Sequence, residues 1–401
     1  MTDHAIAANG PQVTSVLTPA PKEPQQRTAI VDALRGWALL SVVLVNYAIF
    51  YSYDAVIRIP ANDVTSRTLK IIVQVFFQAK GWTLLSLLFG YGFSALMANS
   101  YGGDLSAIRL YTRRMFWLFM LAVVNSSFYY GDILKDYVEM GLVIAVFYRA
   151  SRRTFLILAL SCLLVFPALI PLSRAVHFIA PVPDPPLSLY MSHNLLDVFA
   201  FGLLSGIHVL LSFPKYFDWN LVMWTCGFLG AYLQKTAFFE RLSYDLRLLK
   251  RTLWISLISA VLLPLLRLGF VSLGWHIDRQ YDAYMWFELS LMVFFSSAVC
   301  WGFLKLSRTS VFAAFRCVGR MTLTNYLVQN VVALLLFSGF GFGLLHRRSY
   351  SFSITAAIAV FGFQVWFSHW WLANYRWGPV EWLWRSLTYG RWISNKPFES
   401  S

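Results

Sequence analysis

The chain has 401 residues, of which 58% are hydrophobic and only 13% are charged, and its formal net charge is +14. A soluble domain is nearer half apolar and a quarter charged, so the composition excludes an ordinary soluble protein and predicts a polytopic membrane protein. The basic residues lie between apolar runs, which is typical of loops that set membrane topology and argues against nucleic-acid binding.

The amino-terminal residues 1–28 are rich in Pro, Gln, Ala and Thr and poor in large apolar residues. This composition predicts a disordered tail. The tail lacks the basic region, short apolar region and cleavage site of a removable signal peptide. The first apolar run, which follows Arg27, is therefore expected to remain as a membrane anchor with the tail in the cytoplasm.

Apolar runs recur along the rest of the chain. A membrane-spanning helix needs about 20 apolar residues, and about ten such runs are present. We predict an all-α transmembrane helix bundle over residues 29–373, followed by a cytoplasmic interfacial segment at 374–401. The spans are expected near residues 32–53, 72–98, 112–130, 134–149, 154–173, 219–237, 252–273, 284–304, 320–340 and 352–371.

One further apolar stretch, residues 194–213, is predicted to be re-entrant or to lie on the outer surface. If it spanned the membrane, the basic segment 241–251 would face the outside. Leaving it out places that segment, most other Lys and Arg residues and both termini in the cytoplasm, as expected for a bacterial inner-membrane protein. In the carboxy-terminal segment, Glu381 and Arg385 are four residues apart. This spacing predicts an exposed pair on a short amphipathic helix.

The first predicted span carries three polar residues on one helical face. At about 100° per residue, Asp32, Arg35 and Asn46 fall within about 60° of one another, and Arg35 and Asn46 are roughly 16 Å apart along the axis. One interpretation is a structural ion pair plus an interhelical hydrogen bond. The other is a polar path entered from the cytoplasm, because polar residues at membrane depth usually face a cavity.

Further polar residues lie at membrane depth or near the outer face. Lys80 is expected roughly 13 Å inside the second span, where an ammonium needs a partner or extends outward. Asp132, Asp136 and Glu139 share one helical side, which fits either an acid/base site or a solvated helix start that includes Lys135. The outer loops carry His177, His193 and His276 without the spacing of a metal site, so no metal is expected.

Four stretches together resemble a known family. They are "DALRGWALLSVVLVNY", "KGWTLLSLLFGYGF", "VGRMTLTNYLVQNVVALLLFSGFGFGL" and "RWGPVEWLWRSLTYG", and the last two are the most specific. Over residues 30–392 the chain resembles the YeiB-like family of bacterial membrane proteins (domain of unknown function 418). This family is grouped with transmembrane acyltransferases, which include heparan-α-glucosaminide N-acetyltransferase.

The resemblance implies acyl transfer from cytosolic acyl-CoA to an amine or hydroxyl acceptor. The acetyltransferase pattern D-x-x-R-G, apolar run, V-N-Y is matched at Asp32, Arg35, Gly36, Asn46 and Tyr47, but its histidine is absent from the following "AIFYSYDAVIRIP". On this reading Asn46 stabilises the oxyanion. The other implied residues are Lys80, His193 and His276 for catalysis, and Asp32, Arg35, Arg113 and Arg114 for the phosphates of the donor.

The alternative function is a permease that binds a small polar or anionic solute along the same stripe without covalent chemistry. A membrane scaffold is a third possibility. The partners expected in all cases are the lipid bilayer and, for the first two, a small-molecule acceptor or solute. Self-association into a homo-oligomer is compatible with each.

Overall fold

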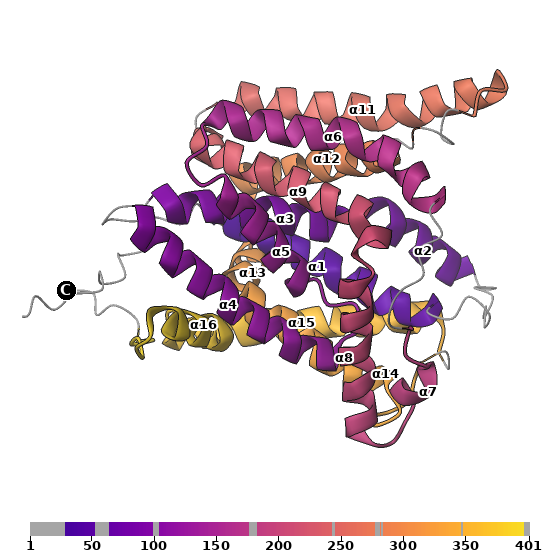
Figure 1. The fold of residues 1–401 in the computed structure, drawn as a ribbon, viewed down its shortest axis with the longest axis vertical. Helices are drawn as coiled ribbons and strands as arrows, with labels where there is room; N and C mark the ends of the chain where they lie inside the picture. Colours follow the sequence, from indigo (N-terminus) through magenta and orange to yellow (C-terminus); the bar gives the residue numbers. More distant parts are fainter. Residues whose placement is uncertain are drawn as a thin grey trace, which may run out of the picture.

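A computed structural model of the chain describes residues 29–52, 64–98, 104–175, 183–242, 245–276, 281, 284–345 and 348–396. Sixteen helices and no strand are found among these residues, which confirms the all-α prediction. The long helices lie side by side as a bundle (Figure 1). The predicted tail at 1–28, together with His177, lies outside the described residues.

The helices have the following bounds: α1 (Ala29–Ser52), α2 (Val64–Phe76), α3 (Lys80–Ala98), α4 (Asp104–Phe128), α5 (Leu134–Val146), α6 (Arg152–Ala175), α7 (Leu187–Tyr190), α8 (Leu195–Leu211), α9 (Phe213–Lys235), α10 (Phe238–Arg241), α11 (Leu246–Ser272), α12 (Tyr284–Leu306), α13 (Ser310–Arg320), α14 (Thr322–Phe337), α15 (Tyr350–Asn374) and α16 (Pro379–Tyr389).

Within the described residues, six stretches are long and apolar enough to cross a membrane. They are Ala29–Phe50, Val64–Ala98, Arg152–Leu169, Leu246–Ser272, Tyr284–Leu306 and Tyr350–Asn374. The chain is therefore a helical membrane protein. The larger number of about ten spans is not confirmed, because the other predicted spans fall on α4, α5, α9 and α13–α14, which are shorter or less apolar.

The predicted re-entrant segment 194–213 corresponds to α8, which has 17 residues. At 1.5 Å per residue such a helix is about 25 Å long, less than the roughly 30 Å of a bilayer core. It packs closely against α4, since a Cβ on Gly202 would meet the carbonyl oxygen of Ser126. Whether α8 enters the membrane stays a prediction.

The helices differ in how they meet their surroundings. The apolar window of α1 is 67% buried inside the bundle, whereas that of α11 is only 11% buried. In Figure 1, α11 lies along one edge of the bundle and α1 lies inside it. The exposed face of α11 carries Trp254, Ile258, Leu262 and Leu265. An apolar surface of this kind is expected to face lipid.

Close contact between α1 and α13 depends on two glycines. A Cβ added to Gly36 would collide with the backbone of Phe315, and one added to Gly319 would collide with the carbonyl of Asp32. Small residues allow helix backbones to approach in membranes. At this contact Gly319, which precedes Arg320 at the end of α13, lies against the Asp32 carbonyl and the Gly36 nitrogen of α1.

The carboxy-terminal helix α16 corrects one prediction. Glu381 is not on an exposed face but is only 9% exposed. Its Oε1 accepts hydrogen bonds from the backbone nitrogens of Leu323 (2.6 Å) and Thr324 (3.1 Å), and Oε2 accepts one from the Thr324 hydroxyl (2.5 Å). These donors belong to the first turn of α14, where free N–H groups attract a carboxylate. Glu381 therefore anchors α16 to the bundle.

Candidate functional site

A cavity of about 210 Å³ opens between α1, α3, α4, α5, α13, α14 and α16, and four arginines lie in its wall. They are Arg35, Arg114, Arg320 and Arg385. We call it the arginine cavity. The rest of the wall is mainly apolar, with Leu39, Leu85, Leu88, Phe89, Phe93, Met115, Leu118 and Leu134. Cationic groups beside an apolar interior suit an anionic ligand with an apolar arm.

The arginines are held by different neighbours. Arg35 contacts Asp32, with Nη1 3.4 Å from Oδ1. The Arg114 guanidinium lies over the Trp384 ring at 4.0 Å, while the Trp384 indole N–H donates to the Arg114 carbonyl at 2.9 Å. Arg320 donates to the Arg376 carbonyl at 3.3 Å. The four guanidinium groups outnumber the carboxylates of Glu381, in the same wall, and of Asp32, beside Arg35, so the arginine cavity carries net positive charge.

A buried hydroxyl also belongs to this cavity. Tyr111 is 2% exposed, and among the residues that the structure describes its hydroxyl has no hydrogen-bond partner. A buried polar group without a partner costs free energy. The Tyr111 side chain lines the cavity, and its hydroxyl is enclosed beside Gly141.

Tyr326 links the arginine cavity to a buried carboxylate. Its ring lines the cavity. Its hydroxyl donates to Oδ1 of Asp132 at 3.2 Å and accepts from the backbone nitrogen of Ile133 at 3.3 Å. Asp132 lies in the turn between α4 and α5 and is 1% exposed. The inner wall of the arginine cavity is thus joined to a titratable group.

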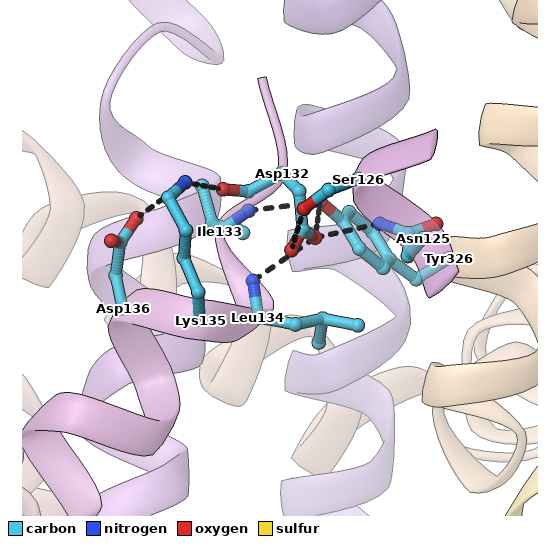
Figure 2. Close-up of polar contacts among 8 residues, drawn as sticks. All are labelled: Asn125, Ser126, Asp132, Ile133, Leu134, Lys135, Asp136 and Tyr326. Atoms are coloured by element: carbon cyan, nitrogen blue, oxygen red, sulfur yellow. Dashed lines mark hydrogen bonds and ion pairs between the residues drawn. The ribbon is translucent and has the colours of Figure 1, made fainter. Parts of the chain in front are cut away.

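Figure 2 shows how Asp132 is held. Oδ1 also accepts from the Asn125 amide at 2.6 Å and from the backbone nitrogen of Leu134 at 3.1 Å, and Oδ2 accepts from Ser126 at 3.5 Å. The Lys135 ammonium donates to the Asp132 carbonyl. Burial raises the pKa of the Asp132 carboxyl, and Lys135 and these hydrogen bonds oppose that rise without cancelling it. A carboxylate made more basic is suited to accept a proton.

A second cavity, of about 280 Å³, lies on the other side of this turn. Its wall includes Asp132, Asp136 and Glu139 together with Lys135, and we call it the acidic cavity. Ile133 lines both cavities. The two cavities therefore share Ile133, and the Tyr326–Asp132 hydrogen bond joins the wall of the arginine cavity to the wall of the acidic cavity.

The predicted donor-binding residues are partly brought together. Arg35 and Arg114 line the arginine cavity, and Asp32 contacts Arg35. Arg113 is exposed and lies beside Gly390, at the end of α16. This geometry is compatible with both interpretations of Asp32 and Arg35, as a structural ion pair and as the start of a polar path.

The predicted catalytic residues lie elsewhere. Asn46 is half-buried on α1 and lines neither cavity. Lys80 is fully buried, and its Nζ lies 2.5 Å from Oε2 of Glu288. His193 and His276 are exposed and line neither cavity. Their catalytic roles stay predictions that this geometry does not favour.

Sequence reasoning assigned no role to Tyr326, Arg320 or Tyr111. The stretch "RMTLTNYLVQN" did carry a signal, because Asn325, Tyr326 and Asn330 lie in an apolar segment. Polar residues at membrane depth are costly without partners. Asn330 donates to Asn125 at 3.0 Å and thereby extends the Asp132 network.

Comparison with known proteins gives the following matches. Residues 233–391, which include α14 and α16, match the family described as "Protein of unknown function (DUF418)". YxaH of Bacillus subtilis (strain 168) is 28% identical over 391 residues, covering 92% of this chain and 95% of that protein. A 39.9 kDa protein from the amylase 3' region of Bacillus acidopullulyticus is 27% identical over 374 residues, covering 91% and 95%.

YeiB of Escherichia coli (strain K12) is 28% identical over 390 residues, covering 90% of this chain and 96% of that protein. No solved structure gives a significant match. These matches confirm the predicted resemblance to YeiB and to the DUF418 family, whose model matches residues 233–391.

Proposed function

We propose that this protein is a membrane-embedded acyltransferase that takes a short acyl group from acyl-CoA. The arginine cavity holds the donor, and the acceptor approaches from the acidic cavity. The observation that carries the proposal is that the two cavities share Ile133 and that the hydrogen bond from Tyr326 to Asp132 joins their walls. Both substrates can thus meet at one point inside the protein.

The arginine cavity fits the chemistry of acyl-CoA. Arginine guanidinium groups bind phosphate oxygens through paired, charge-assisted hydrogen bonds. The apolar wall suits the pantetheine arm and a short acyl chain. At about 210 Å³ the cavity is small for the whole donor. The nucleotide part would therefore remain outside, on the surface near Arg113.

The reaction transfers the acyl carbon from sulfur to an acceptor oxygen or nitrogen. The acceptor attacks the thioester carbonyl, the new C–O or C–N bond forms, and the C–S bond breaks. Asp132 takes the proton that the acceptor loses, and Tyr326 delivers a proton to the departing thiolate and regains one from Asp132. The products are the acylated acceptor and free CoA. Positioned acid–base groups of this kind typically contribute about 10²- to 10⁴-fold to a rate.

The proposal fixes an orientation. Acyl-CoA is cytosolic, so α16 and the arginine cavity would face the cytoplasm and the acidic cavity would face the outside of the bacterial inner membrane. Both termini would then be cytoplasmic, as the distribution of Lys and Arg predicts.

The decisive experiment measures calorimetric binding of acetyl-CoA to protein purified in detergent. Arg35→Ala and Arg114→Ala should each weaken binding by about 10- to 100-fold, since a hydrogen bond to a charged group contributes about 1.5–3 kcal/mol. Arg308→Ala is the matched control, because Arg308 is exposed and lines neither cavity. Thiol release with a panel of hydroxyl and amine acceptors then reports transfer.

Two outcomes would contradict the proposal. One is the absence of acetyl-CoA binding at millimolar concentration, and the other is equal weakening by the Arg308→Ala control. Solute uptake into liposomes without any acyl donor would instead favour the permease. For Asn46, a 100- to 1000-fold slower transfer by Asn46→Ala at unchanged acetyl-CoA affinity would support the oxyanion role.

A further inference from the structure

The acidic cavity has the composition of a binding site in its own right. Asp136 and Glu139 are three residues apart on α5, so they lie on one side of the helix and line the cavity together. The one lysine in the wall, Lys135, lies 3.8 Å from the Asp136 carboxylate and also donates to the Asp132 carbonyl. The wall therefore holds three carboxyl groups and one ammonium, and a cation bound there favours the ionised form of the carboxyl groups.

A second feature points to a ligand independently of this charge. Asn220 on α9 lines the acidic cavity and is only 6% exposed. Its side-chain amide makes no hydrogen bond with any residue that the structure describes. A buried amide without partners costs free energy, whereas one that faces a ligand can donate and accept. Asn220 therefore offers a hydrogen-bonding position that the described part of the chain leaves open.

The remaining wall supplies an aromatic surface. Trp219, which also lines the cavity, is 38% exposed and stacks on Trp82 with ring centroids 3.9 Å apart. This stacking fixes the orientation of the indole. An aromatic face beside carboxylates attracts organic cations through the ring quadrupole.

We infer that the acidic cavity binds an organic ammonium compound, with its charge on Asp136 and Glu139, its body on Trp219 and a polar group on Asn220. The identification of this compound as the acyl acceptor rests on the proposed function, in which its ammonium first gives one proton to the carboxylate of Asp136 or Glu139 and the neutral amine then attacks the thioester. Binding itself does not require an acyl donor. The volume of about 280 Å³ admits a molecule of the size of a substituted ring.

The test uses phenethylamine and phenethyl alcohol, which share a shape and differ in charge at neutral pH. Calorimetry on the full-length protein without acetyl-CoA should show binding of phenethylamine that is at least about tenfold tighter than that of the alcohol. The double variant Asp136→Asn/Glu139→Gln should reduce this ratio to about threefold or less. Glu240→Gln, outside the cavity wall, is the control and should leave the ratio unchanged.

Asn220→Ala supplies a second measurement. This variant should bind phenethylamine more weakly but should still prefer it to phenethyl alcohol, because the carboxylates remain. Equal affinity for amine and alcohol, no binding of phenethylamine at millimolar concentration, or an unchanged ratio in the double variant would each overturn the inference. Amine binding without acyl transfer would contradict only the proposed function, and transfer to hydroxyl acceptors without amine preference would contradict only this inference.

Discussion

The side-chain nitrogen of Lys80 lies 2.5 Å from Oε2 of Glu288, and both residues are buried. The same ammonium donates to the Gln74 carbonyl at 3.2 Å, and the Tyr284 hydroxyl donates to Oε1 of Glu288 at 2.7 Å. The helical conformation is interrupted between α2 and α3 at Ala79, whose φ of 63° is rare for a residue with a side chain. The Lys80–Glu288 pair therefore joins α2, α3 and α12 across this break.

Removing one partner should destabilise the protein more than removing both. Lys80→Met leaves a buried carboxylate without its cation, and we expect a loss of about 3–5 kcal/mol in the free energy of unfolding. Lys80→Met/Glu288→Leu should recover most of it. Thermal unfolding in detergent measures both, with the exposed Lys305→Met as control. Wild-type stability with lost transfer in Lys80→Met would instead support the catalytic role predicted from the sequence.

The contact between α1 and α13 predicts that replacing glycine by alanine destabilises the protein at some positions and not at others. Gly36→Ala and Gly319→Ala place a Cβ against backbone atoms of the other helix, so each should lower stability by about 1–3 kcal/mol. Gly362→Ala on α15 is the matched control, because no atom of another helix lies within 4 Å of its Cβ position. Chemical or thermal unfolding gives the comparison, and similar stabilities for all three variants would disprove the close approach.

Substitutions of Glu381 and Arg385 should have different effects on stability and on acetyl-CoA binding. Glu381→Ala removes the acceptor for two backbone N–H groups of α14, and we expect a loss of about 1–3 kcal/mol of stability. Arg385→Ala should preserve stability and weaken acetyl-CoA binding, since Arg385 lines the arginine cavity. Unfolding curves and calorimetry on both variants check this, and the reverse pattern would refute the assignment.

The proton-accepting role of Asp132 predicts a pH dependence. Burial raises the pKa of its carboxyl above the ordinary value of 3.8. The active form is deprotonated, so the transfer rate should fall as the pH drops through this raised pKa. The fall should occur at a higher pH than it would for a solvent-exposed Asp. Asp132→Asn should lower the rate by about 10²- to 10⁴-fold and abolish this limb of the profile. A limb that survives in Asp132→Asn would assign the titration to another group.

The proposed orientation predicts the labelling of introduced cysteines. Ser349 precedes α15 and Ser394 follows α16, and both are exposed. In a variant without the four native cysteines, Ser349→Cys should react with an impermeant maleimide in intact cells from outside. Ser394→Cys should react only after the membrane is opened. Labelling of both from the same side would reject cytoplasmic termini.

The sequence by itself determined the class of the protein. Long apolar runs with few charges must form buried or lipid-facing helices, because the backbone N–H and C=O groups in a bilayer must form hydrogen bonds within the protein. The stretches that contain Arg35 and Glu381 were among the four that carried the family resemblance. The number of spans could not be decided in this way, because α4 and α9 mix apolar residues with Lys, Arg or Asp. Whether each of these helices crosses the membrane depends on the helices packed around it.

Only the tertiary structure decided which polar residues meet. Helical periodicity put Asn46 on the same face of α1 as Arg35, but the wall of the arginine cavity is completed by residues from distant helices, such as Arg320 and Tyr326. Likewise, i,i+4 spacing paired Glu381 with Arg385, whereas the first turn of α14 holds the carboxylate. Spacing reports contacts within one helix, while partners across helices depend on how the whole bundle packs.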